Sequence, residues 1–149
     1  MLTRLQVDGF KTFEQLDVEF QPFTVVLGSN AAGKSNLFDA LQLLSNLADR
    51  DVNEALRHLR GEPSELFRTT ADGPASRISL AAEVLVDPIV VDSYGSRVAL
   101  KHTRIRYEVV LERREIRPNV PRIHVVEERA FPIAASKDTW AISRCSSEE

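Results

Sequence analysis

The residues Gly28-Ser29-Asn30-Ala31-Ala32-Gly33-Lys34-Ser35 decide the fold of this chain. They match G-x-x-x-x-G-K-S, the pattern of a phosphate-binding P-loop. The apolar run 23–27 comes directly before them and is typical of a buried parallel strand. Apolar residues at helical spacing follow, and they predict a helix from about Lys34 to Ala48. The sequence therefore predicts a strand, a glycine loop and a helix in this order.

The chemistry of such a loop is the binding of an anion. Glycines allow the backbone to curl and to aim successive N–H groups at a phosphate, and the helix N-terminus adds partial positive charge. Lys34 is expected to reach the β- and γ-phosphates of ATP, and the Ser35 hydroxyl to ligate Mg²⁺. The predicted phosphate-binding residues are Gly28, Asn30, Ala31, Ala32, Gly33, Lys34, Ser35 and Asn36. The alternative, a glycine turn that only resembles this loop, is disfavoured by the flanking strand and helix.

Length and composition place limits on the class of protein. The chain has 149 residues and a net charge of −3, so it has the size of one domain, and its charge argues neither for nor against a nucleic-acid partner. A single cysteine, Cys145, excludes an internal disulfide framework and predicts a cytoplasmic location. No apolar run reaches the ~18 residues of a membrane span, so no membrane partner is expected.

The segments around the loop divide by their periodicity. Alternating residues predict a strand over 2–8 and a second over 16–20, joined by the turn 9–13 as an antiparallel pair. Asp51 is the predicted N-cap of a short helix over 52–60.

From Arg77 the period changes to two, which predicts an antiparallel β-meander over residues 77–129. Residues 89–96 are interpreted as a mixed connection within it, and residues 130–149 as a weakly structured tail. The predicted fold class is α/β, a P-loop NTPase lobe with an added antiparallel meander. In domain terms, 1–149 is one ATP-binding lobe, with 1–68 as its strand-loop-helix part and 77–129 as a β-rich arm.

A family resemblance extends beyond the loop itself. The segments 9–13, 23–30 and 33–41, read together, resemble the N-terminal ATP-binding lobe of the SMC, RecF and OLD-nuclease group of ABC-type ATPases. The resemblance covers roughly residues 2–45. It implies that Lys11, in the turn between the first two strands, lies near the nucleotide; a solvated turn lysine is the alternative. It also implies dimerisation around ATP and a role in DNA maintenance or phage defence.

Hydrolysis needs a carboxylate at the end of a second apolar strand, and the sequence shows no such strand ending in Asp-Glu. The nearest matches are 123–128 and 83–87, and both are better interpreted as meander strands. An L-S-G-G segment and a convincing Q-loop glutamine are also missing. We therefore predict an incomplete ATPase that binds ATP and Mg²⁺, and that hydrolyses ATP only with a C-terminal half or a second protomer as partner. Two alternatives stay open: a non-catalytic nucleotide-binding interaction module, and another P-loop enzyme such as a nucleotide kinase.

One cluster suggests DNA as a further partner. The later strands carry a basic run of seven residues: Arg97, Lys101, Arg104, Arg106, Arg113, Arg114 and Arg117. Such a run is typical of a phosphate-contacting surface. However, Glu108, Glu112 and Glu115 alternate with it, which favours a solvated face of mixed charge.

Overall fold

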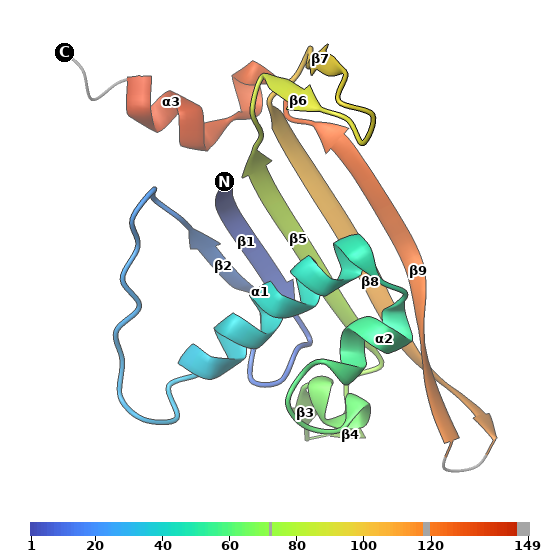
Figure 1. Ribbon diagram of the computed structural model, residues 1–149. Coiled ribbons are helices and arrows are strands. Elements are labelled where there is room, and N and C mark those ends of the chain that lie inside the picture. Colours follow the sequence, from blue (N-terminus) through green and yellow to red (C-terminus); the bar gives the residue numbers. More distant parts are fainter. Residues whose placement is uncertain (72, 118–119, 146–149) are drawn as a thin grey trace.

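The architecture is a five-stranded antiparallel sheet with helices on both faces (Figure 1). The structure, a computed structural model, describes residues 1–71, 73–117 and 120–145. The strand order is β2-β1-β5-β8-β9. These strands are β1 (Leu2–Asp8), β2 (Leu16–Glu19), β5 (Arg77–Leu85), β8 (Arg104–Arg117) and β9 (Val120–Pro132). The predicted N-terminal pair and the predicted meander are thus continuous, because β1 pairs with β5 along most of its length.

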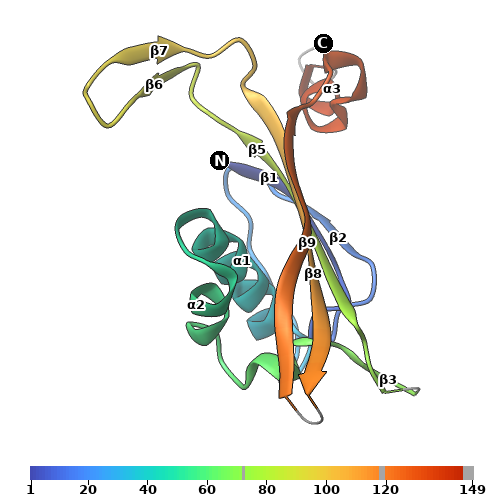
Figure 2. The same cartoon turned by 90° about the vertical axis from the view of Figure 1, so that its right-hand side faces the viewer.

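Two helices cover one face of this sheet and a third lies on the other (Figure 2). α1 (Lys34–Asp49) confirms the predicted helix after the glycine loop, and α2 (Val52–Arg57) follows it directly. Asp51 caps α2 as predicted, since its Oδ1 accepts hydrogen bonds from the backbone N–H groups of Asn53 and Glu54. α3 (Thr139–Cys145) packs on the opposite face. No helix in the described part of the chain is long and apolar enough to cross a membrane.

The core forms where α1 crosses the strands. Alternation along β1, β5 and β8 turns one set of apolar side chains toward α1, as the period of two requires. The buried residues from the strands are Leu5, Val7, Ile78, Leu80, Val109 and Leu111, and those from α1 are Leu37, Ala40 and Leu43. This contact fixes the direction of α1 and therefore the place of the loop that precedes it.

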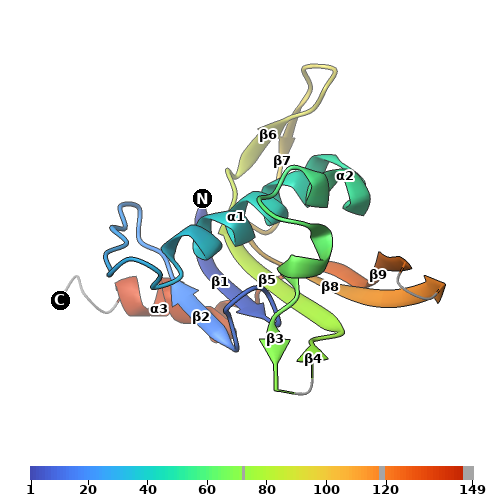
Figure 3. The same ribbon diagram turned by 90° about the horizontal axis from the view of Figure 1, so that it is seen from below.

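Short elements complete the structure. They are η1 (Pro63–Leu66), β3 (Thr69–Thr70), β4 (Gly73–Pro74), β6 (Ile89–Val91), β7 (Arg97–Ala99) and η2 (Ala135–Lys137). β6 and β7 form a hairpin where a mixed connection was expected, and it extends away from the sheet (Figure 3). Its turn is ordered by Asp92, whose Oδ1 accepts from the N–H groups of Tyr94 and Ser96.

The predicted strand over residues 23–27 is wrong for this structure. The segment forms no strand and pairs with none among the described residues, and Phe23 and Leu27 are 83% and 86% exposed. A parallel strand buried on both faces needs strands at its edges and layers above and below. The five strands of this sheet do not pair with it.

The prediction of a weakly structured tail is also wrong for residues 130–145. β9 continues to Pro132, and α3 then docks on the sheet. Asp138 is 3% exposed and Trp140 is 8% exposed, and the indole Nε1–H donates to the backbone oxygen of Phe20 at 2.9 Å. The Trp140 indole and the buried ion pair between Asp138 and Arg104 anchor this part of the chain to the sheet. The short apolar segments in the sequence do not predict these contacts, because the partners lie far away along the chain. Residues 146–149 lie outside the described residues.

Candidate nucleotide-binding site

The glycine loop leads directly into α1. Gly33 is the N-cap residue, with a φ of 87°, and its carbonyl accepts the first helical hydrogen bond from the N–H of Leu37 at 3.0 Å. A Cβ atom at Gly33 would lie 3.3 Å from the ring of Phe13. Both the positive φ and this close approach favour glycine at this position. The loop before it is exposed on its outer side.

The turn between β1 and β2 holds the loop in place. Asn36 Nδ2 donates to Thr12 Oγ1 at 2.9 Å, next to the contact between Phe13 and Gly33. The turn is itself anchored, because the N–H of Lys11 donates to the carbonyl of Leu66 at 2.7 Å. The segment that carries the family resemblance before the loop is therefore in contact with it.

Lys34 and Ser35 occupy the first turn of α1. Lys34 Nζ donates to the backbone oxygens of Gly28 and Ser29, each at 2.6 Å, so its ammonium group lies over the start of the loop. Ser35 is exposed beside it. The structure thus brings the predicted residues 28 and 30–36 together as one exposed loop and helix N-terminus, which is the arrangement that binds phosphate. Both glycines of the loop are closely packed, since a Cβ at Gly28 would lie 3.2 Å from Ala32 and one at Gly33 would lie 3.3 Å from Phe13.

Lys11 is engaged by the helix that follows the loop. Its Nζ donates to Asp39 Oδ2 at 2.6 Å and to the backbone oxygen of Arg60 at 3.2 Å. The Lys11 side chain is 14% exposed, so it is not the solvated turn lysine of the alternative interpretation. Its expected contact with the nucleotide stays a prediction.

Asp39 joins two cations next to the loop. Arg60 donates to Asp39 Oδ1 at 2.9 Å and to the backbone oxygen of Ser35 at 3.1 Å. Burial by itself raises the pKa of Asp39, but the hydrogen bonds from Lys11 and Arg60 lower it by more, and the pKa lies below its usual value. The carboxylate is ionised at neutral pH, so the three side chains carry one net positive charge within about one helical turn of Ser35.

Sequence reasoning missed Asp39 and Arg60. The available signal was the position of Asp39 four residues after Ser35, within the stretch of α1 that also carries the buried Ala40. A carboxylate at a buried helical position needs a cationic or hydrogen-bonding partner. The identity of that partner depends on how residues 58–66 fold back onto α1, which periodicity does not give.

The acids weighed for hydrolysis lie away from the loop. Glu127 and Glu128 belong to β9, and Glu128 Oε1 accepts from the Tyr107 hydroxyl at 2.8 Å. Glu128 lines a hollow with Leu44 and Ala48 in the last turns of α1. At a rise of about 1.5 Å per residue, this is roughly 14 Å along the helix from Ser35. Burial and the bond to Glu128 raise the pKa of Tyr107 to about 12.

Comparison with known proteins agrees with this geometry. Residues 1–125 match the model of the AAA ATPase domain family. The OLD nuclease of Thermus scotoductus is 38% identical over 60 residues, which are 40% of this chain and 11% of the nuclease. The RecF protein of Roseiflexus castenholzii is 28% identical over 114 residues, which are 76% of this chain and 24% of RecF. The chain thus spans less than a quarter of the length of either relative.

The fold is also found among solved structures. An SMC ATPase superimposes with a TM-score of 0.51 over 95% of this chain and 79% of its own, at 17% identity. This likeness concerns the mixed α/β fold with its antiparallel sheet. The family match covers most of the sequence, including the loop, α1 and the sheet strands up to β9. The chain therefore belongs to the AAA ATPase domain family, and it is similar over part of its length to an OLD nuclease and a RecF protein.

Proposed function

We propose that this chain binds ATP with Mg²⁺ through residues 28 and 30–36, as the N-terminal lobe of an SMC/RecF/OLD-like ATPase. The observation that supports this most is the loop that ends at Gly33 and is held at the N-terminus of α1 by the Thr12–Asn36 hydrogen bond. Backbone N–H groups of the loop would receive the phosphates, and Lys34 would neutralise their charge. Ser35 would provide a hydroxyl ligand to Mg²⁺, which offsets charge on the β- and γ-phosphates.

Binding and hydrolysis make different demands on the site. The described residues bring cations and backbone donors to the loop, and Asp39, a turn away, is already bonded to Lys11 and Arg60. Contacts that are equal in the ground state and the transition state do not accelerate the chemical step. We therefore propose that the chain alone turns over ATP very slowly, and that a C-terminal half or a second protomer supplies the missing acid and the missing L-S-G-G segment.

The exposed segment before the loop supports such a partner. Phe23, Val25 and Leu27 are 83%, 60% and 86% exposed, and Phe38 on the outer side of α1 is 59% exposed. An apolar, extended segment without a neighbouring strand is a site for strand addition. We propose that the complementing half pairs here and completes an ATPase domain of which 1–149 is one lobe. The similar SMC ATPase structure comes from a study of ATP-driven dimerization and DNA-stimulated activation of SMC ATPases. By analogy, we propose that this chain forms a dimer and binds DNA, with a role in DNA maintenance or phage defence.

The ATP-binding proposal is tested by calorimetry with ATP and Mg²⁺. Lys34→Ala removes the point charge over the loop and is expected to lower ATP affinity at least tenfold, about 1.4 kcal/mol. Ser35→Ala is expected to weaken binding with Mg²⁺ more than binding without it. Lys101→Ala removes an exposed lysine of the β6–β7 region and serves as the matched control. Equal ATP affinities of Lys34→Ala and Lys101→Ala would show that the loop does not bind the phosphates.

A second measurement separates the incomplete ATPase from a complete one. Steady-state phosphate release from the purified chain is expected to be as low for the wild type as for Lys34→Ala. Turnover that depends on Lys34 in a monomer would contradict the proposal of a missing partner. The second candidate is a non-catalytic nucleotide-binding module. It predicts that ATP binding persists and that no complementing half restores turnover. The distance of Glu127 and Glu128 from the loop favours this candidate for the isolated chain.

A further inference from the structure

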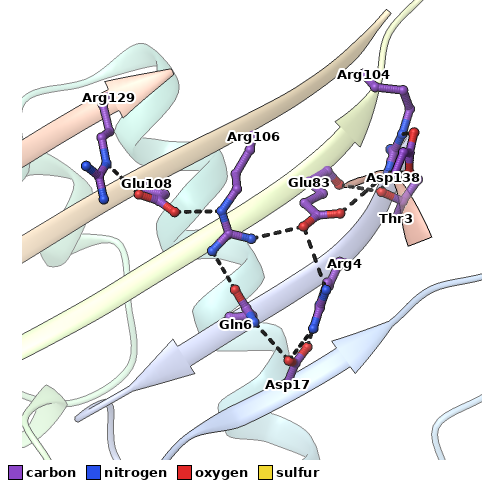
Figure 4. Close-up of polar contacts among 10 residues, drawn as sticks. All are labelled: Thr3, Arg4, Gln6, Asp17, Glu83, Arg104, Arg106, Glu108, Arg129 and Asp138. Atoms are coloured by element: carbon purple, nitrogen blue, oxygen red, sulfur yellow. Dashed lines mark hydrogen bonds and ion pairs between the residues drawn. The ribbon is translucent and has the colours of Figure 1, made fainter. Parts of the chain in front are cut away.

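The face of the sheet opposite α1 carries two sets of charges that differ in balance. Toward the end where α3 docks, ion pairs cross all five strands (Figure 4). Arg106 donates to Glu83 at 3.0 Å, and Arg104 donates to Asp138 at 2.7 Å. The remaining members of this network are Thr3, Arg4, Gln6, Asp17, Glu108 and Arg129. The network contains as many arginines as carboxylates, so Arg104 and Arg106 of the predicted basic run are already neutralised.

The other end of the sheet has an excess of arginine. Arg77 on β5 and Arg114 on β8 both form ion pairs with Glu112. The distance is 2.8 Å for Arg77 and 2.5 Å for Arg114. Arg122 on β9 lies directly opposite Arg114 in the strand register, and like charges in this position are destabilising. We name these three residues, Arg77, Arg114 and Arg122, the arginine band.

The charge of the arginine band is not compensated nearby. Within the described residues Arg122 forms no ion pair, and Glu112 is the one carboxylate bonded to the other two arginines. Glu115 falls on the opposite face of β8 from Arg114, because side chains alternate along a strand. Glu127 lies opposite Val110, about 13 Å along β8 from Arg114. The band and Glu112 thus carry a net charge of about two positive units on a chain whose net charge is −3.

We propose that the arginine band contacts the phosphate backbone of a nucleic acid. The residues are exposed arginines, whose planar guanidinium groups bind phosphate oxygens in pairs. Strands in a sheet lie about 4.8 Å apart, and Arg77 pairs with Glu112, two residues along β8 from Arg114, so the three arginines span about 12 Å on a rigid platform. This span matches three to four successive phosphates, at roughly 3.4 Å of helix axis each along one strand.

The composition of the band favours nucleic acid over a protein partner. The centre of a protein interface is enriched in aromatic and apolar side chains. The band has none among its members, and the exposed apolar residues of the chain are concentrated elsewhere, in the β6–β7 hairpin and around the loop. The inference gives the proposed DNA partner a place on the molecule, and that place is separate from the nucleotide loop, so the two proposals fail independently.

The test measures binding of a fluorescein-labelled 20-base-pair duplex and a 20-nucleotide single strand by fluorescence anisotropy, over a series of salt concentrations. Each phosphate contact contributes about 0.9 to the slope of log affinity against log salt for a duplex, and about 0.7 for a single strand. The double variant Arg114→Gln/Arg122→Gln is expected to lose about 1.8 from the duplex slope and at least about tenfold in affinity at low salt. The matched control, Arg97→Gln/Lys101→Gln, removes the same charge from the β6–β7 region and is expected to bind as the wild type does.

Three further arms make the result decisive. Lys34→Ala is expected to bind both nucleic acids normally, which separates this site from the ATP site. A labelled polyglutamate peptide is expected to bind more weakly than either nucleic acid. If the band variant lost more affinity for the peptide than for the nucleic acids, the partner would be an acidic protein and the proposal would be overturned. Melting temperatures of both double variants confirm that they are folded. The proposal is wrong if the wild type does not bind at low salt, or if the band variant and the control bind equally.

Discussion

Replacement of Asp39 by alanine tests the charge cluster beside the loop. The carboxylate is 4% exposed and accepts hydrogen bonds from two cations, Lys11 at 2.6 Å and Arg60 at 2.9 Å. A buried hydrogen bond to a charged group stabilises by about 1.5–3 kcal/mol, and this applies to Lys11, which is 14% exposed. Arg60 is 67% exposed, so its pair contributes about 0–1 kcal/mol. The expected loss is therefore about 1.5–4 kcal/mol.

The loss is measured by urea denaturation followed by circular dichroism. A decrease of about 3 kcal/mol corresponds to a fall in melting temperature of roughly 6–12 °C for a protein of this size. A double-mutant cycle with Lys11→Met isolates the pair: Lys11→Met is expected to cost at least about 1 kcal/mol less when Asp39 is already alanine. The control is Asp49→Ala, which removes an exposed carboxylate from the last turn of the same helix and is expected to change stability by less than about 0.5 kcal/mol. Additive effects of the Asp39 and Lys11 substitutions would refute the reasoning.

Three other predictions address the sheet and the tail. The hydrogen bond from Arg104 holds the pKa of Asp138 below its usual value, so the ionised carboxylate stabilises the fold at neutral pH and loses this contribution as the pH falls through the lowered pKa. Asp138→Asn is expected to be less stable at pH 7 and to lose less stability than the wild type in acid titrations. Gly9→Ala and Gly95→Ala both place a side chain at positive φ, at a cost of about 1–2 kcal/mol. Only at Gly9 would the new Cβ also lie 2.2 Å from a backbone oxygen, that of Arg77. Urea unfolding is therefore expected to show at least about twice the loss of unfolding free energy for Gly9→Ala. Trp140→Phe removes the indole bond to the Phe20 carbonyl and is expected to cost about 1 kcal/mol by circular dichroism, and an unchanged midpoint would show that this bond does not anchor α3.

Local patterns predicted most of the secondary structure. The period of two placed the sheet strands, and the helical spacing after Lys34 placed α1, because one face of each element is buried and the other is wet. Asp51 was identifiable as a cap because the N-cap preference is a local interaction.

Features that depend on distant residues were not predictable in the same way. Residues 23–27 have the composition of a buried strand, but a strand forms only where neighbouring strands are present. The docking of α3 depends on Asp138 meeting Arg104, which is 34 residues away in sequence. In the same way, the basic run is one cluster in the sequence. The structure separates Arg104 and Arg106, which have carboxylate partners in the network, from Arg114, which shares Glu112 with Arg77.

The position of β1 between β2 and β5 sets the order in which the chain can be assembled during synthesis. β2 follows β1 after a short turn, but β5 begins only at Arg77, so one edge of β1 stays without its partner until residues 9–76 have left the ribosome. Pairings between such distant segments form slowly, and an unpaired edge exposed for that time is prone to associate with other chains. The turn that holds the glycine loop is fastened by the residues just before β5, through the bond between Lys11 and Leu66 and that between Arg68 and Gly9. A nascent chain therefore fastens the glycine loop late, after the loop and α1 have long been synthesised, and a nucleotide bound as proposed can favour the folded state only from that moment on.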